Sequence, residues 1–270
     1  MRKLFLLLCC SGICLGIYAY LIEPRWMEVK KNVIEDSDIP TTFSGLNIIF
    51  ISDIHHGPYF SRERVERVVQ EVNGLNPNII ILGGDYVHRD SKYIDPCFEA
   101  LSGLKAPLGI YAVLGNHDNW EGTEQTKQAM QKAGVKLLDN EAMWLEVDGA
   151  RIKVGGSGDL WTEKQLLDPL LSDVDESDYF ILISHNPDFA EELTSNKVDL
   201  MLSGHTHGGQ VTMFGLWAPL VPSEHGQKYR TGLVETEQTT VLISNGVGTI
   251  TPPLRFFARP QINLITLKTN

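Results

Sequence analysis

The chain has 270 residues, of which 43% are hydrophobic and 9% aromatic. This length fits one or two domains, and the composition supplies a sizeable core and excludes a disordered chain. The formal net charge of −11 argues against broad electrostatic contact with nucleic acid, so no nucleic-acid partner is expected. Bound metal ions would offset acidity that is local to a cation site.

The first segment differs from the rest of the chain. Arg2 and Lys3 precede an uncharged, largely apolar run over residues 4–22, which as a helix of about 1.5 Å rise per residue would roughly span a bilayer core. We therefore expect residues 1–25 to form an N-terminal transmembrane helix that anchors the protein in the cell membrane. A cleavable signal peptide is the alternative, although small residues at the cleavage spacing are missing.

The side of the membrane follows less directly from the sequence. Lys and Arg residues before and after the apolar run nearly balance, so the positive-inside rule does not decide. The signal-like start favours an extracytoplasmic domain, and the cytoplasmic face is the alternative. No oligomeric state is predicted.

Beyond the apolar segment, residues 26–45 are expected to be a connector and residues 46–270 one globular domain. Helices are expected from Ser61 to about Val72 and over residues 123–133. A hairpin is expected around Asp148-Gly149. Short apolar strands are expected over residues 47–52, 79–82, 110–114, 179–184, 199–203, 241–244 and 262–267. The fold class is therefore α/β (α+β), a four-layer αββα sandwich of two mixed β-sheets flanked by helices.

Five of the predicted strands end in polar clusters whose residues can bind metal. The clusters are Asp53-x-His55, Gly84-Asp85, Gly115-Asn116-His117-Asp118, His185 and Gly204-His205-Thr206-His207. Each cluster alone is also typical of a turn, a capping residue or a surface histidine. Because active sites of α/β sheets lie outside the carboxyl ends of the strands, the five clusters together indicate one shared site.

The residue types in these clusters indicate which metals would bind. Cysteine is absent from them, which excludes a structural zinc site of the cysteine type. Imidazole, carboxylate and amide oxygen suit manganese, iron, zinc or cobalt. The seven candidate ligands would overfill one such ion, whereas two ions that share a carboxylate would each keep room for water. The pattern therefore predicts two divalent metal ions.

In this order, the clusters resemble the motifs of the calcineurin-like metallophosphoesterase superfamily, over residues 47–211. Further motifs are similar to the YkuE/YaeI-type branch of membrane-associated phosphodiesterases. They are the N-terminal apolar segment and residues 156–161, 185–188 and 204–210. The resemblance implies an enzyme, a metal-dependent phosphoric ester hydrolase.

The resemblance also implies a role for each residue of the site. The first metal would be held by Asp53, His55 and His207. The second would be held by Asn116, His185 and His205. Asp85 would bridge the two ions.

Two further residues are expected to be catalytic. His117 would lie beside the phosphate without binding metal, and Asn116 and His117 would contact the substrate. Asp118 would orient the His117 ring and fix its tautomer. His56 is expected to point away from the cluster, and His88 only to line it.

The expected reaction is hydrolysis of a phosphodiester or pyrophosphate, possibly lipid-linked, by attack of a metal-bridging hydroxide. A phosphomonoesterase is one alternative, and another class of two-metal hydrolase is a second. A membrane-tethered interaction module that keeps the fold without activity is a third. The intact ligand set argues against the last of these.

The C-terminal region contains apolar, proline-rich stretches over residues 216–222 and 252–260. They are expected to pack in the core and loops. The alternative is a rim that touches lipid, with Phe256 and Phe257 in the interface and Arg255 and Arg259 at anionic head groups.

Overall fold

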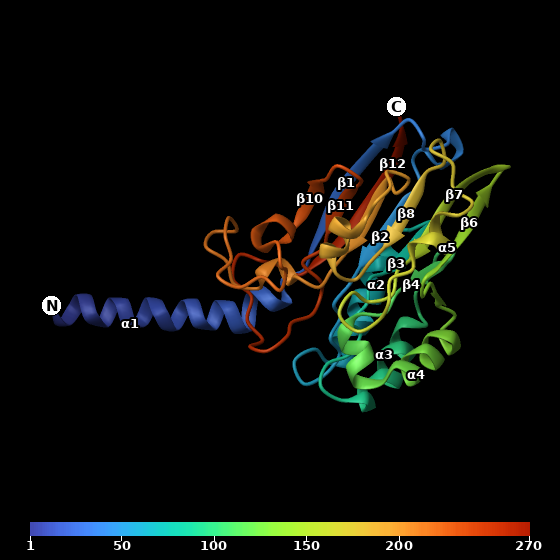
Figure 1. The fold of residues 1–270 in the computed structure, drawn as a ribbon. Coiled ribbons are helices and arrows are strands. Elements are labelled where there is room, and N and C mark those ends of the chain that lie inside the picture. The colour runs from blue at the N-terminus through green and yellow to red at the C-terminus, as the bar shows by residue number, and fades with distance from the viewer.

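The computed structural model describes the backbone of residues 1–270 and all side chains except those of residues 4, 5 and 7. Two six-stranded sheets lie face to face, with three helices on the outer side of the first sheet (Figure 1). Both sheets contain parallel and antiparallel pairs. The predicted sandwich of two mixed sheets with helices is confirmed.

The first sheet has the strand order β1-β12-β2-β3-β4-β5, and only β12 and β2 pair antiparallel. Its strands are β1 (Glu28–Asp36), β12 (Gln261–Thr269), β2 (Asn47–Ile51), β3 (Ile79–Leu82), β4 (Ile110–Ala112) and β5 (Lys136–Leu137). The second sheet has the order β10-β11-β9-β8-β7-β6 and is antiparallel at both edges. Its strands are β10 (Gly232–Glu235), β11 (Thr240–Ile243), β9 (Leu200–Ser203), β8 (Phe180–Ile183), β7 (Ala150–Gly156) and β6 (Glu141–Val147).

The two outer layers of the sandwich are unequal. The first sheet is covered by α2 (Arg62–Gly74), α3 (Ile94–Leu101) and α4 (Asn116–Lys132). The outer core cluster of the second sheet includes residues from only short helices, namely α5 (Leu167–Leu171), η5 (Pro187–Glu192) and η7 (Gly226–Tyr229). Three further 3-10 turns are η3 (Thr41–Phe43), η4 (Ser91–Tyr93) and η6 (His207–Gly209).

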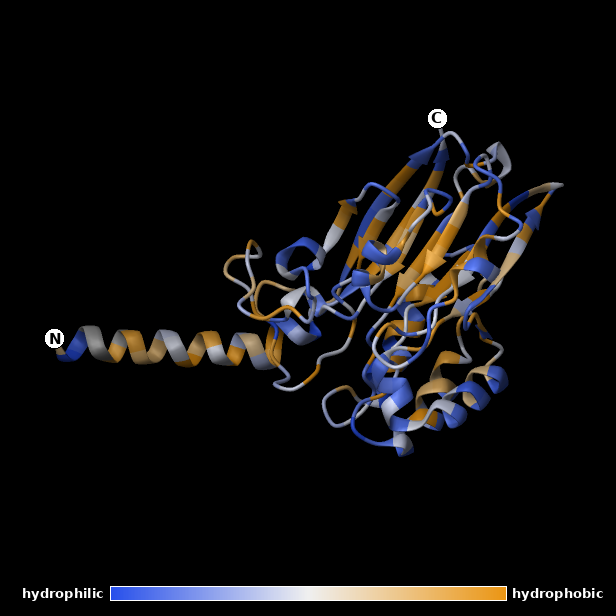
Figure 2. Ribbon diagram, viewed as in Figure 1, coloured by the Kyte–Doolittle hydropathy of each residue, from blue (hydrophilic) through white to orange (hydrophobic). Residues whose placement is uncertain are grey.

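Strand β2 illustrates why these sequences form a sandwich. Successive side chains of a strand point to opposite faces of its sheet. Ile48 and Phe50 belong to the core between the sheets, whereas Ile49 and Ile51 belong to the core under the helices. All four are fully buried, and the central strands are almost uniformly apolar (Figure 2). A strand buried on both faces has to be apolar at every position.

The stretch expected to be a connector, residues 26–45, contains a strand. Glu28–Asp36 forms β1, which pairs in parallel with β12 along its whole length. Its burial alternates between exposed and half-buried residues, as at an edge strand with one solvated face. The chain therefore enters the first sheet well before residue 46.

The transmembrane helix predicted within residues 1–25 is wrong. The α-helix α1 spans Arg2–Ile17, and its 16 residues are about 24 Å long, against about 30 Å for a bilayer core. The π-helical turn η1 (Tyr18–Ile22) and the 3-10 turn η2 (Glu23–Arg25) follow it. Among the helices that the structure describes, none is long and apolar enough to cross a membrane. The predicted localisation in the cell membrane by a single-pass anchor depended on that helix and is corrected with it.

The residues that follow α1 bind to the domain. Glu23 is fully buried, and its carboxylate accepts hydrogen bonds from the backbone N–H groups of Phe257 and Ala258. Arg25 donates to the carbonyl oxygens of Tyr20 and Leu21. α1 itself projects away from the sandwich, with the N-terminus at its far end (Figure 1).

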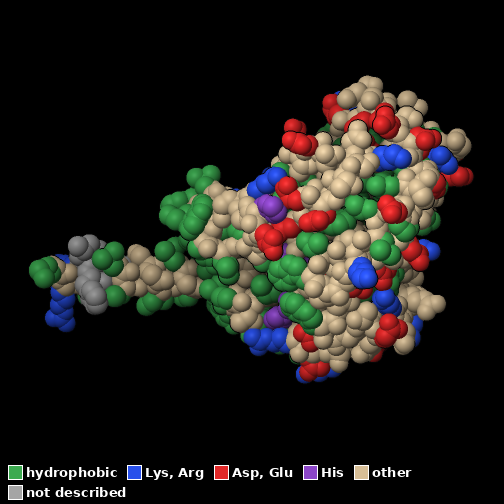
Figure 3. Space-filling model, in the orientation of Figure 1, with side chains coloured by type: hydrophobic (Ala, Val, Ile, Leu, Met, Phe, Trp, Pro, Cys, Tyr) green, Lys and Arg blue, Asp and Glu red, His purple; other side chains and the backbone are tan. Residues whose placement is uncertain are grey.

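Apolar side chains gather where α1 meets the domain (Figure 3). Tyr18 contacts Phe256 edge to face at 6.1 Å, and Phe257 lies 5.4 Å from Phe214 between ring centroids. Arg255, which the alternative of a lipid-touching rim would put at anionic head groups, is instead fully buried. Its guanidinium donates to backbone carbonyls, among them those of residues 245, 246, 248 and 258. A buried charge needs such partners, so Arg255 holds loops together and does not face solvent.

Candidate metal centre

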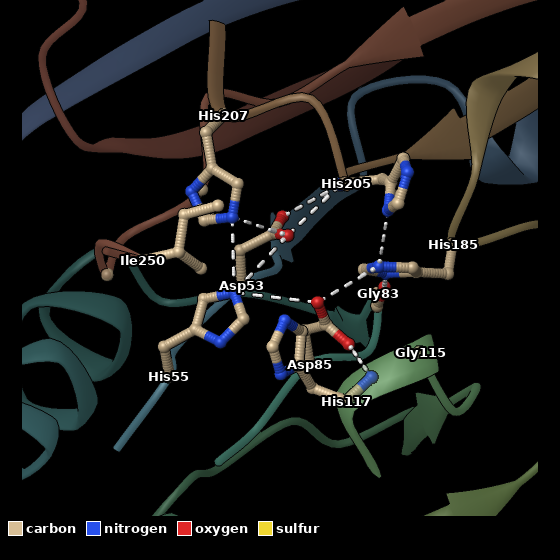
Figure 4. Close-up of polar contacts among 12 residues, drawn as sticks. Asp53, His55, Gly83, Asp85, Gly115, His117, His185, His205, His207 and Ile250 are labelled. Atoms are coloured by element: carbon tan, nitrogen blue, oxygen red, sulfur yellow. Dashed lines mark hydrogen bonds and ion pairs between the residues drawn. The ribbon is translucent and has the colours of Figure 1, made fainter. Parts of the chain in front are cut away.

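The polar clusters that follow β2, β3, β4, β8 and β9 converge at one end of the two sheets (Figure 4). The seven predicted ligands are each at most 5% exposed. They are Asp53, His55, Asp85, Asn116, His185, His205 and His207. The structure therefore brings together residues that lie up to 154 positions apart in the sequence (53 to 207).

One group of ligand atoms lies around Asp53. The Nε2 atoms of His55 and His207 are 3.1 Å apart, and His207 Nε2 is 3.3 Å from Asp53 Oδ1. His55 Nε2 is 3.9 Å from the same oxygen. These three residues come from loops after β2 and β9, so the two sheets share the group.

A second group lies around Asp85. Its Oδ2 is 3.2 Å from His185 Nε2, and His185 Nε2 is 3.3 Å from His205 Nδ1. The same Oδ2 is 3.5 Å from His55 Nε2, which belongs to the first group. Asp85 therefore lies between the two groups.

These separations fit a metal centre. Two ligands at about 2.1 Å from one ion lie about 3.0–3.4 Å from each other. Asn116 Oδ1 is also a buried polar atom without a hydrogen-bond partner. Such atoms are rare in native proteins, and a metal ion bound by this oxygen would explain it. Divalent ions would bind the converging atoms.

The backbone of these loops is unusual. Asp53, His55, Asp85, His205 and His207 all have positive φ, between 48° and 67°. A non-glycine residue in this left-handed region costs free energy, and such residues cluster at functional sites. The strain turns each side chain from the end of its strand into the shared centre.

Gly84 shows how closely the loops approach one another. Its φ is +89°, and a Cβ atom there would lie 2.6 Å from the backbone nitrogen of Gly115 and 2.9 Å from His185 Nδ1. Only glycine fits this position. His185 Nδ1 donates to the Gly83 carbonyl at 2.7 Å, which leaves Nε2 free to accept a metal.

The pKa values of the histidines favour neutral rings at three positions. Burial lowers the pKa of His205 to about 3 and the pKa values of His55 and His207 well below their ordinary range. Neutral imidazole is the form that binds metal. Burial also acts to lower the pKa of His185, but the charge and hydrogen bond of Asp85 outweigh it and raise that pKa.

The two carboxyl groups differ. Burial raises the pKa of Asp53 to about 6, against the opposing effect of His185. Burial acts to raise the pKa of Asp85 too, but His185 holds it well below the ordinary value. Asp85 is therefore the more firmly ionised carboxylate.

Asp118 does not hold His117 in the way that the sequence suggested. Its carboxylate accepts three backbone hydrogen bonds, from the N–H groups of Asp85 at 2.7 Å, Tyr86 at 2.8 Å and Gly115 at 2.9 Å. His117 Nδ1 has no hydrogen-bond partner. Three aligned N–H donors attract the carboxylate more strongly than one ring does. Burial nevertheless raises the pKa of Asp118 to about 8.

Two histidines flank the candidate ligands. The ring of His117 lies 4.8 Å from the ring of His55, and His117 N–H donates to Asp85 Oδ1 at 2.9 Å. His88 lies 5.1 Å from His117 and 5.5 Å from His55 between ring centroids. Ring nitrogens of the three histidines lie within 4.8 Å of one another, closer than expected for a residue that only lines the site. His56, by contrast, donates to the Phe60 carbonyl, away from the cluster.

Sequence comparison agrees with this geometry. Residues 46–209 match the family model of the calcineurin-like phosphoesterases. The chain is 33% identical to the uncharacterised metallophosphoesterase YkuE of Bacillus subtilis, over 93% of this chain and 89% of that protein. It is 29% identical to the phosphodiesterase YaeI of Escherichia coli, over 93% of this chain and 92% of that protein.

A solved structure shares the fold. The NAD nucleotidase of Haemophilus influenzae aligns with a TM-score of 0.53 and 14% identity, over 75% of this chain and 50% of that one. At this identity the likeness concerns the fold alone. The fold, the histidine–aspartate cluster and the sequence relatives together define a metal-dependent hydrolase of phosphoric esters. The chain belongs to the calcineurin-like phosphoesterase family.

Proposed function

We propose that the protein is a binuclear phosphodiesterase. One divalent ion would be held by Asp53, His55 and His207. The other would be held by Asn116, His185 and His205. The observation that carries this proposal is the position of Asp85 Oδ2, 3.5 Å from His55 Nε2 and 3.2 Å from His185 Nε2, between one ligand of each ion.

Two ions explain the composition of the cluster better than one. Seven buried ligands exceed what one ion of this class binds while keeping a position for water. Asn116 supports the second ion, because its buried Oδ1 has no partner among the described residues and an amide oxygen is a metal ligand. Manganese, iron, zinc and cobalt all suit this donor set.

When bound, two divalent ions lower the pKa of a shared water and neutralise the phosphate oxygens. The protein's own residues position the reacting groups. The His117 ring lies 4.8 Å from the His55 ring, beside the cluster, where the imidazole would donate a proton to a phosphate oxygen or to the leaving group. Asn116 and His117 lie together at the start of α4 and would contact the same phosphate.

Asp118 acts through the backbone in this proposal. By accepting hydrogen bonds from the N–H groups of Asp85 and Gly115, it fixes the two loops that carry Asp85 and Asn116. It is a positioning residue for the centre rather than a partner of the His117 ring.

A phosphodiester or pyrophosphate is the proposed substrate. The support comes from the Escherichia coli relative, whose name is phosphodiesterase and which aligns over almost its entire length. A phosphomonoester is the competing substrate, because the metal cluster alone does not distinguish the two.

Hydrolysis of bis(p-nitrophenyl) phosphate and of p-nitrophenyl phosphate tests the proposal. With manganese, we expect turnover of the diester at a higher kcat/KM than of the monoester, abolished by EDTA and restored by added metal. Asp53→Ala should be inactive, whereas the control His225→Ala, at an exposed histidine, should match the wild type. Faster monoester turnover would overturn the diester assignment, and activity that survives EDTA would overturn the metal mechanism.

A further inference from the structure

Two exposed tryptophans lie directly against the metal cluster. Trp120 is 57% exposed and its ring lies 4.9 Å from His117. Trp161 is 51% exposed and its ring lies 4.3 Å from His205. The two indoles are 6.4 Å apart and nearly parallel, with 28° between their planes. They form an aromatic pair beside the position proposed for the phosphate.

Backbone contacts position the two segments that carry the indoles. Trp120 follows His117 by three residues in the first turns of α4, so the two side chains lie on one face of the helix. The backbone N–H group of Trp161 donates to the carboxylate of Asp159 at 3.1 Å. Asp159 is almost completely buried.

A hydrogen bond also joins the two segments that carry the tryptophans. Asn119 Nδ2, next to Trp120, donates to Thr162 Oγ1 at 2.7 Å, and that hydroxyl in turn donates to Asp159. The segment that carries one indole is thus linked to the segment that carries the other. Linked segments keep the pair together and so favour its pre-organisation for binding.

Two other tryptophans of the chain have cationic partners. Arg259 lies over the ring of Trp26 at 4.3 Å, and Arg151 lies over Trp144 at 3.8 Å. Trp144 also donates its indole N–H to Asp173. In the part of the chain whose side chains are described, no Lys or Arg lies over Trp120 or Trp161. Among these residues no cation therefore competes with a ligand for stacking on either indole.

We propose that Trp120 and Trp161 form a stacking platform for a planar aromatic ring of the substrate. The inference rests on the proposed function and narrows its substrate to phosphoric esters that carry such a ring, as a nucleoside does. Flat faces of near-parallel indoles match a flat ring, and stacking on tryptophan tolerates any base. A neutral ring also needs no positive charge from this acidic protein, while the phosphate is bound by the metals.

Isothermal titration of the full chain with two Mn²⁺ per chain tests the platform independently of turnover. The ligands are adenosine 5′-monophosphate, ribose 5-phosphate, which lacks the base, and hexyl phosphate, which has a flexible apolar chain. We expect the nucleotide to bind about fivefold to 150-fold more tightly than ribose 5-phosphate, the range for stacking one base. Hexyl phosphate should bind with an affinity close to that of ribose 5-phosphate.

The double substitution Trp120→Leu/Trp161→Leu should remove the preference for the nucleotide without changing the affinity for ribose 5-phosphate. Trp217→Leu is the matched control, because Trp217 is 48% exposed and lies in a loop outside this pair. It should keep the preference.

Three results would overturn the platform. They are no preference for the nucleotide in the wild type, an unchanged preference in the double variant, and a gain for hexyl phosphate equal to that for the nucleotide. Failure of the proposed function would give another result. The protein would then bind the nucleotide in preference to ribose 5-phosphate but would hydrolyse no diester. If the double variant does not fold, the wild-type comparison of the three ligands alone decides.

Discussion

The strands of the sandwich and the loops that follow them obey opposite rules. In β2, β3, β8 and β9 nearly every residue is apolar and fully buried, with a regular extended backbone. In the loops directly after these strands, many of the buried residues are polar, and five of these polar residues have positive φ. Burying polar groups and holding residues in the left-handed region both cost free energy. The apolar burial of the strands offsets this cost of the loops.

The comparison also explains which contacts support the loops. Asp118 and Arg255 are buried ionisable side chains that bond to backbone groups, one as an acceptor and one as a donor. Both side chains bond to loop backbone groups that have no partner in a β-sheet. Substitutions in the loops should therefore change chemistry, and substitutions in the strands should change stability.

Among substitutions that leave the metal ligands intact, His117→Ala should have the largest effect on activity. Loss of a proton donor beside the reacting phosphate lowers kcat by about 10²-fold to 10⁴-fold. Metal content and melting temperature should stay at the wild-type level, since His117 is not among the proposed ligands. Steady-state kinetics with elemental analysis checks both, and unchanged kcat would remove His117 from the mechanism.

Ile265→Ala should have the largest effect on stability. Ile265 is fully buried between the sheets and pairs with Ile48, at the end of β2 opposite the metal loops. The cavity should lower the free energy of unfolding by about 2–5 kcal/mol, measured by urea titration, and Ile265→Val by about 0.5–1.5 kcal/mol. The kcat of the folded enzyme should not change. A large loss of kcat in the folded variant would contradict the claim that strand substitutions change stability and leave the chemistry unchanged.

Asp199→Asn should have the smallest effect, which is a change in how the free energy of unfolding depends on pH. Burial raises the pKa of Asp199 to about 7, and its carboxylate accepts a hydrogen bond from the Phe180 N–H. The folded state then binds more protons than the unfolded state between about pH 4 and pH 7, so Asp199 lowers stability as pH rises through this window. The asparagine keeps an acceptor but cannot ionise.

Urea titrations of Asp199→Asn and the wild type at pH 5 and pH 8 check this. The free energy of unfolding of the variant minus that of the wild type should be larger at pH 8 than at pH 5. An equal difference at both pH values would show that Asp199 ionises normally in the folded protein.

Most of the fold could be predicted because the strands are local apolar runs that end in polar residues. The order of the clusters pointed to one site, and the structure brings the seven candidate ligands together. Sequence spacing could not show that β1 begins within residues 26–45, because an edge strand with a solvated face is mostly polar.

Other features depend on contacts between distant segments. The segment after α1 is held to the domain by Glu23, which binds the backbone of residues 257 and 258, and no local pattern reveals this contact. The sequence alone left open whether Arg255 is exposed, and in the structure its guanidinium donates to five backbone carbonyls in the core. Asp118 is next to His117 in sequence, but the backbone N–H groups of three loop residues attract its carboxylate. The aromatic pair joins two segments 41 residues apart (120 to 161).

The metal content of Asp85→Asn tests the central claim most directly. Purified wild-type protein should hold two divalent ions per chain by elemental analysis, and so should the control Asp168→Asn, at an exposed carboxylate. If Asp85 bridges the two ions, Asp85→Asn should lose both together. A variant that keeps one full equivalent of metal and loses only the other would contradict the shared carboxylate.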